Sequence, residues 1–199
     1  MNFSRCYYKK TKKNFVRLSS LFLVTSISFF PFFQLHAQKA QKKSFQLEQK
    51  EAQLISPSTL SQKVDALLFE YSNQQREKKG LPALKHLEVI QKAARDHSQD
   101  MMKRQYLSHF SPEKKSVVDR VAKYVKEVRA SLGENLHSVQ SQKGLTDPEA
   151  IAKVMMEDWM GSKSHRANIL GEQFTRMEIA CVSSWTQIYC TQVFAGEGL

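Results

Sequence analysis

The chain has 199 residues, of which 41% are hydrophobic and 25% are charged, as in an ordinary globular protein with one domain and a tail. Its formal charge is +11, but residues 1–37 hold six basic residues and no acidic one, which leaves +5 for the rest. The basic excess therefore indicates a targeting segment, and we expect no nucleic-acid partner.

Residues 1–37 are predicted to be a secretory signal peptide. A basic start is followed by an apolar stretch over residues 21–33, and a cleavage site fits Leu35-His36-Ala37. An uncleaved membrane anchor is the alternative, although Thr, Ser and Pro interrupt a run that is short for a bilayer span of about 20 residues. We expect a secreted, periplasmic or envelope protein, with a polar linker over residues 38–57 and a folded domain over residues 58–197.

Four helices are expected in this domain, because apolar residues recur there at helical spacing. The first starts near Ser58, capped by Ser58 or Thr59, and ends by Gly80. In the fourth, Asp147 is a natural N-cap before Pro148, and Trp159 is expected in the packed core. His97, on the inner face of the second helix, is interpreted as a core histidine rather than a ligand. The other three helices are predicted over 87–105, 116–125 and 148–160.

The end of the chain changes to a period of two, which is typical of a β-hairpin. One strand holds Met177, Ile179 and Cys181, and the other runs from Ile188 to Phe194. Cys181 and Cys190 can face each other and form a disulfide, or remain two buried free thiols. With a further strand over residues 132–136, the sequence predicts an α+β domain in layers.

The usual catalytic signatures are absent: the sequence has no HExxH helix, no GxSxG elbow and no phosphate-binding glycine loop. Short polar segments lie between the apolar helices instead. Each is weak by itself, but their order and spacing together are informative. These segments are Leu107-Ser108-His109-Phe110, Gly133-Glu134-Asn135-Leu136, residues 159–170 and residues 189–194.

These four segments resemble the signature segments of the CAP superfamily (cysteine-rich secretory protein, antigen 5, pathogenesis-related 1), in the same order. The likeness covers residues 60–196 and is greatest to the bacterial, SCP-like branch. It implies an α-β-α sandwich, with a small antiparallel sheet between helices and a large central cleft. His109 and His165 match the two histidines of the cleft, and Glu134 matches one of its two glutamates. Ser162 stands where animal and plant members have the second glutamate, and Arg176-Met177-Glu178-Ile179 replaces a strand that often contains glycine.

Two imidazoles and a carboxylate can hold Zn²⁺ with water as a fourth ligand, so His109, His165 and Glu134 are candidate metal ligands. Without metal, the same groups can bind a polar ligand or act as a general base. Asn135 and Asn168 are expected to hold loops through their amides. An Asp158/Ser162/His165 triad is possible on paper, but nothing in the sequence places an oxyanion hole.

We therefore expect a binding module rather than an enzyme, with a cleft that holds a metal ion, a lipid or another small ligand. Its partners would be a small molecule, a lipid, an envelope component or another protein, and the chain would be a monomer or a weak dimer. A zinc-assisted hydrolase of peptide or cell-wall bonds is one alternative. A structural or adhesive envelope protein is another.

Overall fold

Three antiparallel strands form the centre of the fold in the order β1-β3-β2. They are β1 (Leu132–Gln140), β2 (Arg176–Ser183) and β3 (Gln187–Ala195). A computed structural model describes residues 55–199, so the predicted signal peptide and the linker up to residue 54 lie outside the described residues. Because β3 pairs with both neighbours, it fixes the position of β1 relative to the β2–β3 hairpin.

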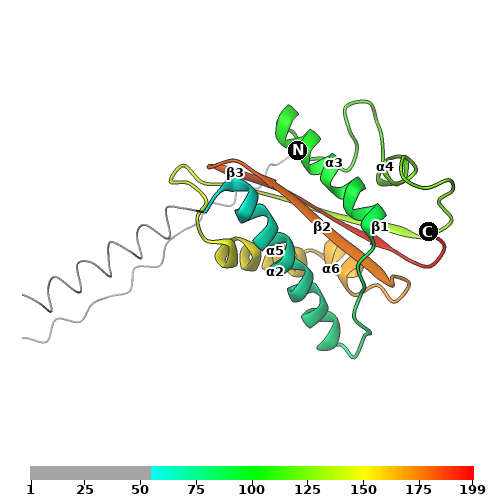
Figure 1. The fold of residues 1–199 in the computed structure, drawn as a ribbon. Helices are drawn as coiled ribbons and strands as arrows, with labels where there is room; N and C mark the ends of the chain where they lie inside the picture. The colour runs from blue at the N-terminus through cyan, green and yellow to red at the C-terminus, as the bar shows by residue number, and fades with distance from the viewer. Residues whose placement is uncertain (1–54) are drawn as a thin grey trace, which may run out of the picture. The chain divides into compact units, whose positions relative to one another are not determined.

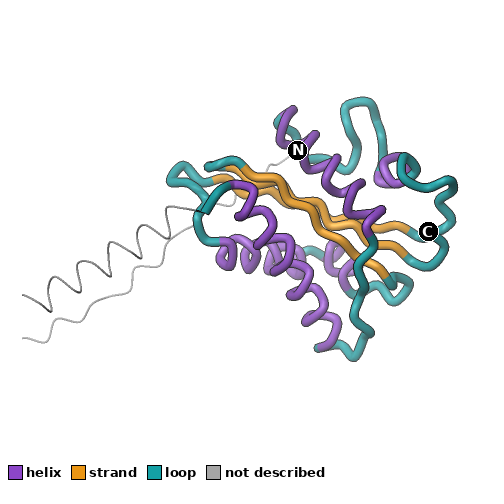
Figure 2. Tube along the Cα trace, viewed as in Figure 1, coloured by secondary structure: helices purple, strands orange, loops and turns teal. Residues whose placement is uncertain are grey.

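Helices cover both faces of the sheet, as Figure 1 and Figure 2 show. One face packs against α2 (Pro57–Glu77) and α5 (Pro148–Gly161), with α6 (Lys163–Ile169) beside them. The other face packs against α3 (Glu88–Arg104) and α4 (Val117–Val121). The predicted α-β-α sandwich is therefore confirmed. Within residues 55–199 no helix has both the length and the apolar character needed to cross a bilayer.

The side chains of the hairpin alternate between the two faces. Met177 and Ile188 enter the core beneath α2 and α5, whereas Ala180 and Val193 enter the core beneath α3 and α4. Both faces of the central strand are buried, and burial of its apolar area stabilises the sandwich at about 25 cal/mol for each Å² removed from water. Trp159 lies in the first core, as predicted, and its indole Nε1 donates to the Leu136 carbonyl over 3.1 Å.

Most predicted helix ends agree with the structure. The Asp147 carboxylate accepts from the backbone N–H of Ala150 and caps α5, with Pro148 in its first turn. The N-cap of α2 is Ser56 rather than Ser58 or Thr59, because the Ser56 hydroxyl accepts from the Thr59 N–H. Helix α4 begins after Ser116 as expected but ends at Val121, short of the predicted end at residue 125.

Helix α6 was not predicted from the sequence. Of its residues only Ile169 is buried, so no apolar stripe marks it as a helix. Tertiary contacts hold it in place: buried Arg76 of α2 donates to the carbonyls of Ile169 over 2.9 Å and Gly171 over 2.8 Å. This anchor fixes the segment that carries His165.

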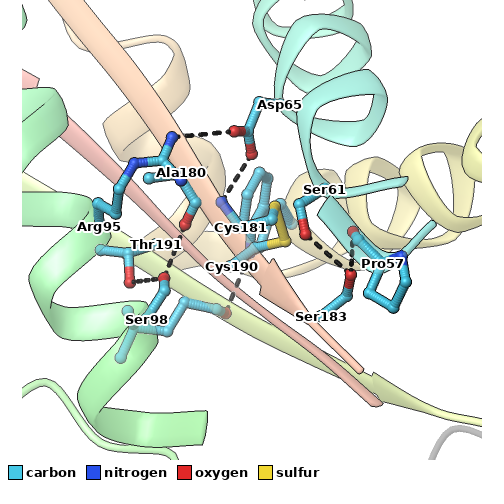
Figure 3. Close-up of a disulfide and its surroundings, with 12 residues drawn as sticks. Pro57, Ser61, Asp65, Arg95, Ser98, Ala180, Cys181, Ser183, Cys190 and Thr191 are labelled. Carbon is cyan, nitrogen blue, oxygen red and sulfur yellow. Dashed lines mark hydrogen bonds and ion pairs between the residues drawn. A yellow bond between two sulfur atoms is a disulfide. The ribbon is translucent and has the colours of Figure 1, made fainter. Parts of the chain in front are cut away.

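The predicted disulfide is present, and the alternative of two free thiols is wrong. Cys181 and Cys190 lie opposite each other in the β2–β3 register and their sulfur atoms are bonded. Figure 3 shows the bond beneath α2, where Asp65 accepts from the Cys181 N–H over 2.6 Å. On the α3 side, Ser98 donates to the Ala180 carbonyl over 2.7 Å. The hairpin is thus tied to a helix on each face.

Candidate functional site

Glu134 lies at the base of the candidate site, on β1. Its carboxylate is 4% exposed and meets two partners. The imidazole Nδ1 of His109 is 2.8 Å from Oε1, and the guanidinium of Arg120, from α4, donates to Oε2. The residue before it is Gly133, and a larger residue would not fit there, because a Cβ would come within 2.8 Å of the Phe174 ring. Both carboxylate oxygens are therefore engaged by this protein's own side chains.

His109 stands on the loop that follows α3. Gln105 ends the helix with a positive φ of 56°. Side chains of the core then hydrogen bond to the backbone of the loop. Buried His97 donates from Nε2 to the Ser108 carbonyl over 2.8 Å, and Arg120 donates to the carbonyls of His109 over 3.3 Å and Lys115 over 3.0 Å. The His109 side chain itself is 51% exposed, so a fixed backbone presents an accessible imidazole.

Side-chain amides connect the backbone at His165 to strand β1, which carries Glu134. Asn135, on β1, donates from Nδ2 to the His165 carbonyl over 3.1 Å and to Gln192 Oε1 over 2.9 Å. Asn168, on α6, donates from Nδ2 to the Glu134 carbonyl over 3.1 Å and to Asn135 Oδ1 over 2.9 Å. The backbone that carries His165 is therefore joined to the strand that carries Glu134.

The histidines of the site affect one another electrostatically. Burial lowers the pKa of His165, and the positive charge that nearby His109 and His137 can carry lowers it further. His165 is therefore neutral at pH 7 and can accept a hydrogen bond or donate a lone pair. Burial and the Arg120 charge likewise lower the pKa of His97, in keeping with its expected place in the core.

A second imidazole–carboxylate pair lies beside this site. His137 Nε2, on β1, is 2.8 Å from Asp158 Oδ2, on α5. The Ser162 hydroxyl instead contacts the Ser164 hydroxyl over 3.2 Å. Of the residues of the possible Asp158/Ser162/His165 triad, Asp158 thus contacts His137 and Ser162 contacts Ser164.

Comparison with known proteins places the chain in a family. A model of the Cysteine-rich secretory protein family (CAP) matches residues 69–194. The chain belongs to this family. It is 35% identical over 135 residues to the protein YkwD of Bacillus subtilis (strain 168), covering 66% of this chain and 48% of YkwD. The CAP chain therefore spans about half the length of that relative.

Solved structures show the same fold. An extracellular protein containing a SCP domain from Bacillus anthracis str. Ames has a TM-score of 0.57 and 26% identity, and the match covers 72% of this chain and 44% of that one. An outer surface protein of Borrelia burgdorferi has a TM-score of 0.57 and 15% identity, covering 67% of this chain and 92% of that one. At this identity the second match concerns the fold alone.

The CAP residues of the site fit zinc only in part. Both carboxylate oxygens of Glu134 already accept hydrogen bonds, one from His109 and one from Arg120. Within residues 55–199 no three side chains of His, Cys, Asp or Glu are grouped as metal ligands. The imidazoles of His109 and His165 are the other candidate donors, and a zinc site normally has at least three protein ligands.

Two residues of the site escaped the sequence analysis. Arg120 is 4% exposed and is hydrogen bonded to Glu134, yet it stands in a segment predicted from its valines. His137 directly follows the Gly133-Glu134-Asn135-Leu136 segment. That position is the one local feature of the sequence that could have indicated its place beside the site. The sequence analysis named Asp158 only as part of a possible triad, whereas the structure places its carboxylate against His137.

Proposed function

We propose that this CAP domain is a binding module outside the cytoplasm, in which His109 is the polar anchor for a small amphipathic ligand. The observation that carries the proposal is the fixed and accessible imidazole of His109. Its Nδ1 faces buried Glu134, so the outer Nε2 of the neutral ring has a lone pair available to a hydroxyl or amide donor.

The surroundings of His109 favour a ligand that is partly apolar. Leu107 is 40% exposed and Phe110 is 55% exposed, and both stand on the same loop as His109. Large apolar side chains grouped at a polar site are typical of surfaces that bind other molecules. A ligand with a hydroxyl head and an apolar body, such as a lipid or an amphipathic envelope component, would meet both kinds of group.

The proposed location agrees with the descriptions of structural relatives. One is an extracellular protein and the other an outer surface protein. Together with the predicted signal peptide, these relatives support export of this chain. The disulfide between Cys181 and Cys190 supports the same proposal, because such bonds persist in oxidising compartments.

Native mass spectrometry of protein recovered from its own envelope tests the proposal. We expect a bound small molecule, or uptake of offered lipids, by the wild-type chain and about tenfold weaker uptake by His109→Ala, since a hydrogen bond to the imidazole is lost. His86→Ala is the matched control, because His86 is an exposed histidine on a different carboxylate, Glu178. Recovery without ligand and no uptake of any lipid would refute the proposal.

A zinc-assisted hydrolase is the second candidate, and the His109–Glu134 pair supports it as a general base. It requires stoichiometric Zn²⁺ on His109 and His165, and an activity lost in both His109→Ala and His165→Ala. Calorimetric titration with Zn²⁺ at neutral pH tests the first requirement. A purely structural or adhesive role instead requires that Glu134→Ala change stability and leave the cellular role intact.

A further inference from the structure

Beyond the end of α3, the face of the sheet that this helix covers continues with polar, uncharged side chains. The strand register places Gln140 of β1 beside Gln187 of β3, and Ser138 beside Tyr189. Because side chains alternate along a strand, these four lie on the same face as Val193, which is buried beneath α3. Gln140 is exposed and the other three are half-buried, so a ligand can reach this part of the sheet.

Trp185 stands in the turn that joins β2 to β3, at the end of this part of the sheet, and is 57% exposed. The backbone N–H of Leu145 donates to the Trp185 carbonyl over 2.8 Å, and the Ser184 hydroxyl accepts from the Gln187 N–H over 3.1 Å. The disulfide closes the same hairpin. A ligand that covers the indole therefore costs little backbone freedom. The hairpin-end surface, as we call it, consists of Ser138, Gln140, Trp185, Gln187 and Tyr189.

Three polar side chains of the hairpin-end surface have hydrogen-bonding capacity to spare. Among residues 55–199, no group hydrogen bonds to the hydroxyls of Ser138 and Tyr189 or to the side-chain amide of Gln140. Gln187 differs, because its amide exchanges two hydrogen bonds of 3.2 Å with the Gln105 amide at the end of α3. Hydroxyl and amide groups can each donate and accept, so a ligand with many neutral polar groups finds several partners here.

The hairpin-end surface carries no charged side chain, and this decides which class of ligand it suits. Nucleic acids and anionic lipid surfaces bind to clusters of Lys and Arg, whereas in the loop over residues 141–145 that holds the turn only Lys143 is charged. A neutral sugar ring is the better match. Its hydroxyl groups point outward from the edge of the ring and can bond to amides and hydroxyls, and its C–H faces can pack on the indole.

We propose that the hairpin-end surface is a second binding site, which takes a neutral saccharide chain. One sugar ring stacks on Trp185, because aromatic side chains bind through their flat apolar faces. The hydroxyls of a neighbouring ring bond to the Gln140 amide and the Tyr189 hydroxyl. A rigid aromatic side chain beside adaptable amide and hydroxyl groups is a combination that recurs in surfaces built for recognition.

This second site does not rest on the function proposed for His109. Glu134, the partner of His109, lies on the same face of β1 as Ser138, but four residues earlier. At the rise of a strand, that separation is about 13 Å. A saccharide at the hairpin end and a small ligand at His109 can therefore be tested separately, with variants that each remove one site.

Two soluble probes test the site, a tetramer of N-acetylglucosamine and cellotetraose, which has the same kind of ring without the acetamide group. Tryptophan fluorescence reports on the site directly, because Trp159, the other tryptophan of the chain, is fully buried. We expect a saturable change with at least one probe and a Kd of about 1 mM or tighter. NMR of the ¹⁵N-labelled protein should show the shifts confined to residues 138–145 and 183–189.

Three variants fix the location. Trp185→Ala should weaken binding at least tenfold by removing the stacking surface. Tyr189→Phe keeps the ring and should weaken it about fivefold, since one hydrogen bond is lost. Tyr124→Phe is the matched control and should bind as the wild type does, because its hydroxyl bonds to Asp96 outside this surface.

Several outcomes would overturn the proposal. One is the lack of a saturable response to both tetramers, and another is unchanged binding in Trp185→Ala. Loss of saccharide binding in His109→Ala would place the sugar at the His109 site instead. Binding to phosphatidylglycerol vesicles that Trp185→Ala abolishes, without any saccharide binding, would assign the hairpin-end surface to a membrane.

Discussion

Two carboxylates of this CAP domain, buried Glu134 and largely buried Asp65, have opposite electrostatic surroundings. Glu134, on β1, is in direct contact with the buried Arg120 guanidinium and with His109. Asp65, on α2, receives a backbone N–H from Cys181, and its cation, Arg95, is 3.6 Å away and 41% exposed (Figure 3). Burial raises the pKa of Asp65 to about 7, and neighbouring Glu178 adds to the rise.

The two carboxylates therefore differ in charge: Glu134 is paired with a buried cation, whereas Asp65 lies in a packed contact without one. A carboxylate buried against a buried guanidinium stays fixed and can orient an imidazole. A carboxylate buried beside a backbone N–H and a distant arginine loses its solvation and gains a proton near neutral pH. The first arrangement therefore keeps Glu134 fixed beside His109, and the second makes stability depend on pH.

Removal of Arg120 should have the largest effect. Arg120→Met leaves Glu134 buried without its cation, which should destabilise the domain by about 3–5 kcal/mol in urea unfolding. Arg129→Met is the control, because Arg129 pairs with Glu127 on the surface, and its effect should stay within about 0.5 kcal/mol. The double variant Arg120→Met/Glu134→Gln should recover part of the loss. A loss below about 1 kcal/mol in Arg120→Met would remove the contrast with Asp65.

The charge state of Asp65 should be visible in the pH dependence of stability. Its folded pKa is about 7 against an ordinary value of 3.8, so the native state binds more protons than the unfolded state between about pH 4 and 7. Its contribution to stability therefore falls as pH rises through that window.

Asp65→Asn should remove this trend. The variant should gain roughly 2–4 kcal/mol over the wild type between about pH 4 and pH 8, because no charge is buried at the higher pH. Urea unfolding of both proteins at several pH values measures the difference in their free energies of unfolding. Other titrating groups affect both proteins equally, so their contribution cancels in this difference. A constant difference between the two proteins across this range would show that Asp65 titrates normally.

The disulfide beside Asp65 should contribute next. Cys181 and Cys190 are 9 residues apart in sequence, and a crosslink of that length stabilises by about 2–3 kcal/mol in the chain-entropy account. Thermal unfolding with and without a reductant measures the effect, and Cys181→Ala/Cys190→Ala shows that the reductant acts on this bond. Equal melting temperatures in both conditions would indicate that the hairpin needs no crosslink.

Loss of Arg95 should have the smallest effect of the four. Arg95→Met removes a half-exposed cation at 3.6 Å, which should destabilise by less than about 1 kcal/mol. It should also raise the pKa of Asp65 further, since the guanidinium favours the ionised carboxylate. A large loss of stability would mean that Arg95 supports Asp65 as Arg120 supports Glu134.

The features that could be predicted from the sequence are those that depend on neighbouring residues. Asp147 before Pro148 indicated the start of α5, and alternation around Cys181 and Cys190 indicated the hairpin and its disulfide. These features depend on residues that are neighbours in the chain, so their pattern can be recognised without the fold. The sandwich itself was expected from the CAP resemblance, and the structure confirms it.

Contacts between distant segments were beyond local patterns. Arg120 lies on a short valine-rich helix, and only the approach of β1 turns it into the partner of Glu134. His137 and Asp158 meet because β1 and α5 pack together, although they are 21 residues apart. The roles of His109, Glu134, Ser162 and His165 in binding stay predictions, although the structure brings Glu134 and His109 into contact.

The strand order has a consequence for how the domain is assembled. In β1-β3-β2 the middle strand is also the last of the described elements along the chain, and neither outer strand pairs with the other. A chain that lacks residues 187–195 has no central strand, so β1 has no partner in the sheet and β2 keeps only the bridge from Arg176 to Lys85. Formation of the sheet therefore joins segments that are distant in the sequence, and non-local pairings of this kind slow the folding of small domains.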